Sequence, residues 1–329
     1  MVDEVHMARA LALAGSVRAT TAPNPWVGCV VVPEGSFDQG AHEGATAPPG
    51  GPHAEVTALA SAGAAARGAT LYTTLEPCAH VGRTPPCVEA IIQAGVRRVV
   101  IGVLDPDPLV SGRGVGALEA AGIAVTTGVL GTEVTEQLAP YLKHRRTGRP
   151  WVVLKLAVTL DGRTAAPDGS SKWITGDAAR ADVHRLRSVS DAVLVGAGTV
   201  RADDPSLTVR LDQDGATQPL RVVLGSVSPG ARIRPAVELG GDLGGVLDEL
   251  GSRGVLQVLV EGGAAVAHGF HAAGLVDRYV VYVAPALFGG DDGRPMFAGP
   301  GAPTMAELWR GRLVSVAQLG DDLRLEVAA

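Results

Sequence analysis

Four residues of the chain have the types and spacing of a zinc site with an adjacent proton carrier. His53 and Glu55 stand two positions apart, and Cys78 and Cys87 follow a strand-like run. One imidazole and two thiolates can hold a tetrahedral zinc ion whose fourth position stays open for water, and zinc lowers the pKa of that water toward neutrality. Glu55, outside the ligand set, would carry the water's proton to a leaving amine. The pattern therefore predicts hydrolytic release of ammonia from an amidine-like carbon of a nucleobase or pyrimidine.

The spacing of the cysteines departs from the commonest nucleobase-deaminase pattern, in which two residues separate them. Here eight residues lie between Cys78 and Cys87. A purely structural alternative is that His53 caps a helix and that the cysteines are small buried groups. The zinc interpretation is favoured because Cys78 follows a strand-like run that ends at Leu75, and because Cys87 opens a helical run.

Helical and strand-like runs alternate along the chain, which predicts a layered α/β architecture. In the first half we expect helices at 7–14, 53–62, 87–94 and 114–121, and strands at 28–32, 69–73, 98–103 and 123–126. In the second half we expect strands at 151–157, 192–195, 220–224, 256–261 and 278–284. The polar and basic stretch 141–150 marks a domain boundary, which divides the chain into 1–146 and 147–329.

Two glycine-rich turns in the second half are a second chemical signal. The segments 195–201 and 260–266 each follow an apolar strand and lead toward a helix. Backbone amides at such a junction bind phosphates, because glycine allows close approach and the helix start is electropositive. Neither turn has the third glycine of the dinucleotide fingerprint. On these residues alone, tight packing turns remain the alternative.

Composition and charge narrow the class of protein. The 329 residues, 46% of them hydrophobic and 19% charged, suffice for two cores. A net charge of −6 and an aromatic content of 4% disfavour a nucleic-acid base deaminase, which needs a basic, aromatic groove. Three cysteines make no disulfide framework, and Cys29, in an apolar run, is expected in the core. No secretory signal or membrane-spanning run is evident. We expect a cytoplasmic enzyme that binds neither nucleic acid nor membrane.

The long zinc segment and its flanks resemble the bifunctional deaminase/reductase family of riboflavin biosynthesis. In the first half the similarity rests on 74–87 (TLEPCAHVGRTPPC), 24–30 (NPWVGCV), 105–108 (DPDP) and 112–114 (GRG). In the second half, the blocks 154–157, 160–163, 171–175 and 202–210 resemble that family's reductase domain. The resemblance implies a cytidine-deaminase-like three-layer sandwich followed by a dihydrofolate-reductase-like domain. It further implies one zinc ion per chain, NADPH, and a phosphorylated pyrimidine that is first deaminated and then reduced at its ribose.

Matched residue by residue, the family's motifs imply further site residues. Those expected to contact the substrate are Asn24, His42, His80, Arg83, Ser171, Arg187, Leu207, Arg210 and Glu261. Those expected to contact the cofactor are Ala157, Trp173, Thr199, Asp203, Gly263, Ala264 and Gly269. Lys155 and Asp203 join Glu55 as expected catalytic residues. Without the resemblance, Trp173 would be interpreted as packing and the charged residues as solvated ends of elements.

One segment departs from the family pattern. Residues 236–245 are short and glycine-rich where the family has an additional strand and loop beside the cofactor, which predicts the loss of one strand and an open adenosine side. An alternative function follows, namely a deaminase whose second domain only binds or dimerises. In either case we expect a homo-oligomer formed through the second domain.

Overall fold

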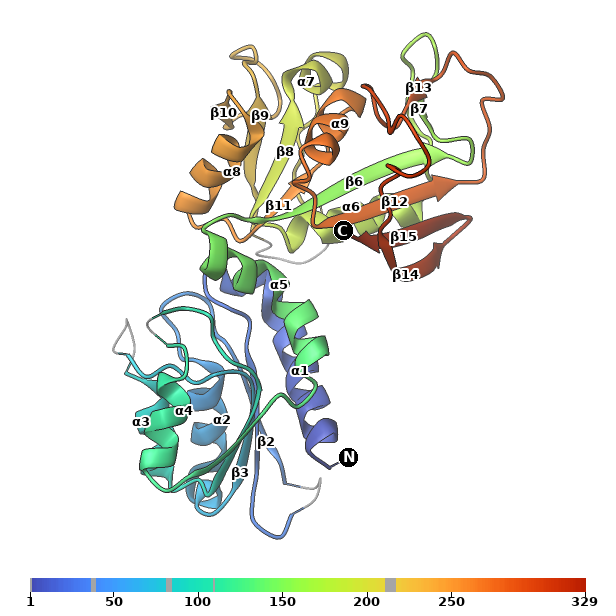
Figure 1. The fold of residues 1–329 in the computed structure, drawn as a ribbon. Coiled ribbons are helices and arrows are strands. Elements are labelled where there is room, and N and C mark those ends of the chain that lie inside the picture. Colours follow the sequence, from blue (N-terminus) through green and yellow to red (C-terminus); the bar gives the residue numbers. More distant parts are fainter. Residues whose placement is uncertain (1, 37–39, 81–84, 109, 211–216) are drawn as a thin grey trace. The chain divides into compact units, whose positions relative to one another are not determined.

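The computed structural model describes residues 2–36, 40–80, 85–108, 110–210 and 217–329. The chain forms two compact units, Met1–Gly148 and Arg149–Ala329 (Figure 1). The polar stretch that begins at Tyr141 is the last part of helix α5 (Gly131–Thr147) and not a linker. Its basic residues complement the negative end of the helix dipole, and Gly148, with φ 72°, ends the helix in the left-handed conformation.

The first unit is built on one five-stranded sheet in the order β2-β1-β3-β4-β5. The strands are β1 (Gly28–Val32), β2 (His42–Ala45), β3 (Thr70–Leu75), β4 (Arg98–Val103) and β5 (Ala124–Thr127). β1 runs antiparallel to both of its neighbours, whereas β3, β4 and β5 are parallel. The amino end of β1 therefore lies beside the carboxyl end of β3, where the Gly28 amide donates to the Thr74 hydroxyl.

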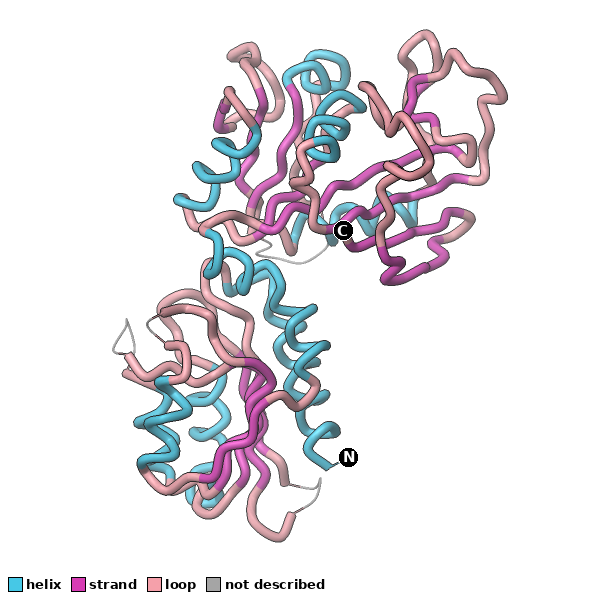
Figure 2. Tube along the Cα trace, in the orientation of Figure 1, coloured by secondary structure: helices cyan, strands magenta, loops and turns pink. Residues whose placement is uncertain are grey.

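Helices cover both faces of this sheet, so the unit has three layers (Figure 2). One face carries α1 (Val2–Thr21) and α5. The other carries α2 (Ala54–Ala62), α3 (Cys87–Ala94) and α4 (Arg113–Ala120), with a short 3₁₀ turn, η1 (Gly63–Ala66), after α2. The three-layer sandwich expected for this half is confirmed. Cys29 is fully buried, as expected.

The second unit is built on an eight-stranded sheet in the order β10-β9-β8-β11-β6-β12-β15-β14. Its strands are β6 (Trp151–Thr159), β8 (Ala192–Gly196), β9 (Leu220–Leu224), β10 (Val237–Leu239), β11 (Gln257–Val260), β12 (Arg278–Ala284), β14 (Arg312–Leu319) and β15 (Asp322–Ala328). All pairs from β10 to β12 are parallel, and β12, β15 and β14 are antiparallel. A separate two-stranded sheet pairs β7 (Arg163–Ala165) with β13 (Arg294–Pro295).

Alternate residues of the second sheet pack into two cores. Leu154 and Val260 pack against α8 (Leu243–Ser252) and α9 (Ala264–Ala272). On the opposite face, Val153 packs in a cluster with α6 (Asp177–Ser188) and α7 (Ala197–Asp203). Since both faces of the central strands are buried, they read in the sequence as continuous apolar runs.

The expected loss of a strand between 236 and 245 is wrong. The three residues of β10 pair in parallel with β9 at the edge of the sheet. Gly241, with φ 95°, then turns the chain, and the Asp242 carboxylate caps α8 by accepting from the Gly245 amide at 2.9 Å. Ten residues thus suffice for a short strand, a turn and a capped helix start. None of the helices in the described parts of the chain combines the length and apolarity needed to cross a bilayer.

Candidate active sites

The first candidate site lies where α2 and α3 begin, beside the carboxyl end of β3. His53 precedes α2 and its side chain makes no capping bond, so the helix-cap alternative does not explain it. Its Nδ1 lies 3.2 Å from Cys87 Sγ and 3.6 Å from Cys78 Sγ. The three potential ligand atoms all lie within 4.8 Å of one another. One nitrogen and two sulfurs at this separation fit a zinc ion.

The two cysteines lie close enough to shift each other's pKa. The hydrogen bond from Cys87 and the His53 side chain lower the pKa of Cys78 to about 4, although burial opposes them. The pKa of Cys87 moves upward, chiefly because its proton is held by Cys78 and because the thiol is buried. A cation at this position would favour ionisation of both sulfurs, since a coordinating thiol is deprotonated.

Glu55 lies in the first turn of α2 with 4% of its surface exposed. Burial raises the pKa of this carboxyl group, and the nearby Cys78 thiolate adds to the shift. The Thr73 hydroxyl on β3 lies 3.4 Å from Glu55 Oε1 and also donates to the Leu75 carbonyl. Thr73 was not expected from the sequence. The only signal would have been its place on the strand that leads to Cys78.

The other residues expected in this site are placed unevenly. Asn24 lies in the segment before β1, at the sheet edge from which the chain also continues to Cys78. His80 is exposed two residues after Cys78. His42 begins β2 and its Nδ1 contacts Ser61 Oγ at 3.2 Å, near the end of α2 opposite to His53. Arg83 lies outside the described residues.

The second candidate site lies at the carboxyl ends of β8 and β11, beside the middle of β6. Arg187 of α6 donates two hydrogen bonds, of 2.6 and 2.9 Å, to the carboxylate of Glu261. Glu261 follows β11, and its amide donates to the Leu194 carbonyl of β8. Lys155 of β6 is close enough to interact with this pair. Burial lowers the pKa of Lys155, while the Glu261 carboxylate opposes the shift.

The two glycine-rich turns meet at the carboxyl ends of β8 and β11. The first turn leads from β8 into α7, and the second leads from β11 into α9. The Gly263 amide donates to the Thr199 hydroxyl at 3.2 Å, which joins the turns. Ala264 opens α9, whereas Gly269 lies inside it and packs close to Leu243 of α8. Backbone amides at the start of the nine-residue α9 fit the anionic groups of a dinucleotide.

The remaining residues predicted for the reductase site lie on several segments of the second unit. Ala157 lies two positions after Lys155 on β6, and Asp203 is the last residue of α7. Trp173 is 70% exposed and stacks against the Arg180 guanidinium at 4.6 Å, so it is not part of the core. Ser171 lies two residues before it.

Leu207 and Arg210 belong to one irregular segment next to α6. Leu207 is buried with φ 50°. Arg187 donates to the Thr208 carbonyl at 3.3 Å, and the Arg210 amide donates to His184 Nδ1 at 3.3 Å. His184 was missed in the sequence, although its position three residues before Arg187 places both on one helix face.

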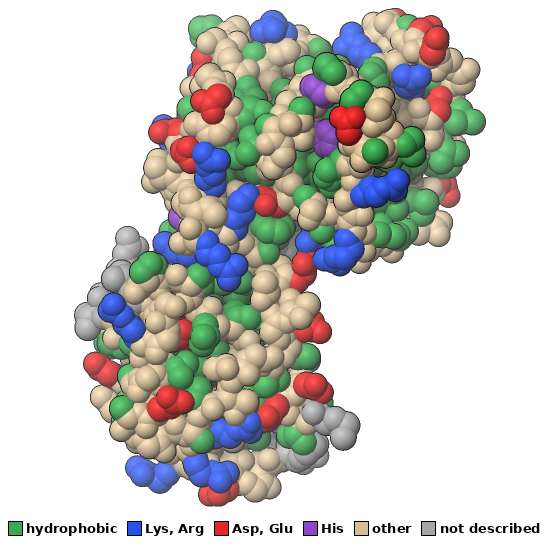
Figure 3. Space-filling model, in the orientation of Figure 1, with side chains coloured by type: hydrophobic (Ala, Val, Ile, Leu, Met, Phe, Trp, Pro, Cys, Tyr) green, Lys and Arg blue, Asp and Glu red, His purple; other side chains and the backbone are tan. Residues whose placement is uncertain are grey.

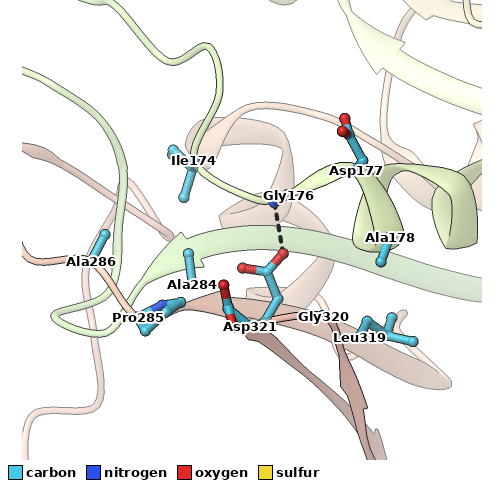
Figure 4. Close-up of a pocket in the computed structure, with 11 residues that line it drawn as sticks. Ile174, Gly176, Asp177, Ala178, Ala284, Pro285, Ala286, Leu319, Gly320 and Asp321 are labelled. Atoms are coloured by element: carbon cyan, nitrogen blue, oxygen red, sulfur yellow. Dashed lines mark hydrogen bonds between the residues drawn. The ribbon is translucent and has the colours of Figure 1, made fainter.

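A separate hollow of about 400 Å³ lies at the carboxyl end of β12. It is lined by residues 174, 176–178, 284–286 and 319–322, and the Asp322 carboxylate accepts from the Gly176 amide at 2.7 Å (Figure 4). The lining includes none of the residues predicted to act in either site.

Comparisons with known proteins match a different family description to each of two parts of the chain. Residues 150–325 match the family described as RibD C-terminal domain, and residues 1–103 match the cytidine and deoxycytidylate deaminase zinc-binding region. The chain is 41% identical to the riboflavin biosynthesis protein RibD of Escherichia coli (strain K12), with 99% of both chains covered. It is 44% identical to RibD of Mycobacterium tuberculosis (strain ATCC 25618 / H37Rv), with 100% of this chain and 98% of the relative covered.

Solved structures show the same similarity over the whole length. Acinetobacter baumannii RibD, form 1, superposes with a TM-score of 0.93 at 41% identity, covering 99% of this chain and 98% of that one. A diaminohydroxyphosphoribosylaminopyrimidine deaminase/5-amino-6-(5-phosphoribosylamino)uracil reductase from Thermotoga maritima gives 0.87 at 36% identity, with 99% and 98% covered. The expected fold class, a cytidine-deaminase-like sandwich followed by a dihydrofolate-reductase-like domain, is confirmed.

Proposed function

The chain belongs to the RibD family of riboflavin-biosynthesis proteins, and on this premise we propose which of its residues carry each reaction. The protein is a bifunctional enzyme. It hydrolyses the 2-amino group of 2,5-diamino-6-(5-phosphoribosylamino)pyrimidin-4(3H)-one and then reduces the ribosyl group to ribityl with NADPH. We assign the deaminase to residues 1–146 and the reductase to residues 147–329.

The deaminase assignment rests above all on the convergence of His53, Cys78 and Cys87 beside the buried Glu55. His53 Nδ1 and the two sulfurs would hold the zinc ion of this family. When bound, zinc would supply hydroxide near neutral pH by lowering the pKa of a water molecule. Glu55 accepts the proton of the attacking water and delivers it to the leaving amino group. Burial suits it to this task, because it raises the pKa of the carboxyl group and so makes the group a better acceptor for the water's proton.

Substrate contacts are assigned by position. Asn24 stands at the sheet edge that leads to Cys78, and the exposed His80 follows Cys78 closely, so both can face a bound pyrimidine. We keep Arg83 and His42 as family-based assignments. His42 has the least structural support in this set, because it contacts Ser61 near the end of α2. Ser61 follows His53 by eight residues, which is about 12 Å along the helix axis at 1.5 Å per residue.

In the reductase we propose Lys155 as the proton donor to the sugar oxygen. When bound, NADPH would supply the hydride. The lowered pKa of Lys155 makes its ammonium a better proton donor than an exposed lysine. Asp203 would hold a hydroxyl or amide group in register. Ala157, Trp173, Thr199, Gly263, Ala264 and Gly269 form the proposed cofactor set.

The substrate's phosphate and sugar are assigned to the segment next to α6. Arg210 is exposed, and Arg187 of α6 donates to the Thr208 carbonyl of the same segment. Guanidinium groups suit phosphate oxygens through forked donors. Leu207, Ser171 and Glu261 complete the proposed substrate set. Because Arg187 already binds Glu261, we assign it the task of orienting that carboxylate as well as attracting the anionic substrate.

A coupled assay tests both halves of the proposal. The diaminopyrimidine substrate is supplied with NADPH, and ammonia release and NADPH oxidation are followed separately. Both signals are expected, with oxidation dependent on prior deamination. Ammonia release without NADPH oxidation would favour the alternative in which the second domain only binds or dimerises.

We further propose that the enzyme is a homo-oligomer formed through the reductase domain. β14 is the edge strand of the large sheet, and its hairpin with β15 exposes Leu313, Val316 and Leu323 at 57%, 54% and 42%. Hydrophobic side chains are visible on the surface around this hairpin (Figure 3). Covering such an edge removes apolar surface and unpaired backbone groups from water. Sedimentation of the purified protein tests this, and a monomer at micromolar concentration would contradict it.

A cytoplasmic location belongs to the proposal, because free thiols persist where the environment is reducing.

A further inference from the structure

Glu76 stands two residues before Cys78 and binds one loop of the deaminase through four backbone amides. The donors are Asp105 (3.3 Å) and Gly112 (3.1 Å) to Oε2, and Gly114 (3.0 Å) and Val115 (3.3 Å) to Oε1. The residue is 3% exposed. Hydrogen bonds to an ionised carboxylate are about twice as strong as neutral ones, and here both oxygens are used. The motifs at 105–108 and 112–114 have no role in the proposed reaction, and these hydrogen bonds connect them to the zinc segment.

Two of these donors lie in the first turn of α4. The residue before the helix is Gly112, which has no side chain to cap it. Amides at a helix start lack partners within the helix, and the positive end of the dipole favours an anion. Glu76 therefore serves as the missing cap, supplied from the end of β3.

The start of α4 also presses directly on the backbone that leads to Cys78. A Cβ atom at Gly114 would lie 2.2 Å from the Pro77 carbonyl oxygen, which only glycine avoids. The amide of Glu76 itself donates to the Val103 carbonyl of β4 at 3.0 Å. The Glu76–Pro77 unit is thus fixed by β4 and by α4.

A second helix start holds Cys78 from the other side. The Cys87 amide donates to Cys78 Sγ at 3.4 Å, and the Val88 amide donates to the Cys78 carbonyl at 3.3 Å. Cys87 and Val88 open α3. The side chains at positions 76 and 78 therefore accept from amides at the starts of two different helices, and Pro77 joins them.

We propose that Glu76 is a positioning residue of the zinc site, which sets where Cys78 stands relative to His53 and Cys87. The inference rests on the proposed zinc ligands. Glu76 does not touch the ligand atoms; it acts through the two peptide units between its carboxylate and Cys78. Its loss would leave the ligands present but would remove the bonds that hold one of them in place.

Glu76→Gln is the principal test, because it keeps the shape and replaces one acceptor oxygen by a donor that faces amide donors. Zinc affinity, measured by chelator competition, is expected to fall about 10-fold or more, as for loss of other groups that orient metal ligands. Backbone hydrogen exchange of residues 112–115 should accelerate. Glu76→Asp keeps the carboxylate on a shorter side chain, so its zinc affinity and its exchange rate should lie between those of the parent and of Glu76→Gln. Glu89→Gln, the same change at an exposed position of α3, is the matched control and should bind zinc as the parent does.

The deaminase kcat at saturating zinc should fall in Glu76→Gln while the KM for the pyrimidine and the reduction of pre-deaminated substrate stay unchanged. Parental zinc affinity in Glu76→Gln would overturn the inference, as would weakened affinity without faster exchange at 112–115. If Glu76→Gln does not fold, Glu76→Asp decides by the same two measurements. Zinc affinity is read without catalysis. A parent protein that binds zinc but releases no ammonia would therefore refute the proposed function and leave this inference testable.

Discussion

Arg187 and Glu261 form a two-bond ion pair across 74 positions of the sequence, with only 11% and 8% of their side chains exposed. Although burial alone would raise the pKa of Glu261, its bonds to Arg187 hold that pKa below the usual range. Glu261 therefore stays ionised beside Lys155. Arg187 thereby fixes the position of the Glu261 carboxylate at the carboxyl end of β11, where the proposed sugar and cofactor sites meet.

Breaking this pair should destabilise the reductase unit. Arg187→Met leaves the Glu261 charge buried without its partner, and loss of one member of a buried pair costs about 3–5 kcal/mol. Urea unfolding followed by tryptophan fluorescence measures the change. Arg253→Met is the control, because its pair with Glu249 is 44% and 46% exposed and such pairs contribute about 1 kcal/mol or less. Equal effects of the two changes would contradict the prediction.

Replacement of Cys78 by serine should remove zinc. A hydroxyl is a poor substitute for a thiolate, and the remaining His53 and Cys87 leave too few ligands for a stable tetrahedral site. Metal analysis should find one zinc per chain in the parent and almost none in Cys78→Ser. Cys29→Ala, which alters a buried cysteine outside the ligand set, should keep its zinc. Full occupancy in Cys78→Ser would refute the assignment.

Glu55→Gln should separate proton transfer from metal binding. An amide cannot accept the proton of the attacking water, so ammonia release should fall by about 10²–10⁴-fold while zinc content is retained. NADPH oxidation with pre-deaminated substrate should persist, because that reaction belongs to the other unit. Deaminase turnover close to the parental rate would point to a different base.

The reductase should lose activity at high pH. A proton donor must be protonated, and burial lowers the pKa of Lys155 from its usual value of 10.5. The rate of NADPH oxidation should therefore decline as pH rises through that lowered pKa, so that the alkaline limb of kcat/KM lies below pH 10.5. Lys155→Met should lose most turnover at every pH. A rate that rises across this range would exclude Lys155 as the donor.

Asp203→Ala should weaken only the reductase. Asp203 is the last residue of α7, which follows the proposed cofactor turn. NADPH affinity, measured by titration, and the steady-state rate of NADPH oxidation should both fall, whereas ammonia release stays at the parental rate. Asp291→Ala, the same change at an exposed position of the same unit, serves as the control. If NADPH does not bind the parent even at millimolar concentration, the binding-only alternative for this domain is preferred.

Local patterns predicted the elements whose bounds are set locally. The strand Gly28–Val32 and the helix Cys87–Ala94 were predicted to the residue, because an apolar run and a helical repeat define them. Helix α1 was predicted at 7–14 but spans Val2–Thr21. Its first turn is held by Asp3, which accepts two bonds from Arg98, and a contact over 95 positions leaves no local pattern.

The sites divide in the same way. The three proposed zinc ligands, which the structure brings together, could be predicted because their types and spacing are distinctive within a few dozen residues. The bond from Arg187 to Glu261, the support of Arg210 by His184 and the capping of α4 by Glu76 join residues 74, 26 and 36–39 positions apart. Such pairings arise only when strands and helices are brought together, so the family resemblance named several of the residues but not their partners.

The bond between the Gly263 amide and the Thr199 hydroxyl has a thermodynamic consequence for the cofactor. It links the turns that follow β8 and β11 before any ligand arrives, so the loss of their conformational freedom occurs during folding and not during association. A ligand that spans both turns then meets a rigid receptor. Cutting this link with Thr199→Val should therefore appear in calorimetry as a less favourable entropy of NADPH association.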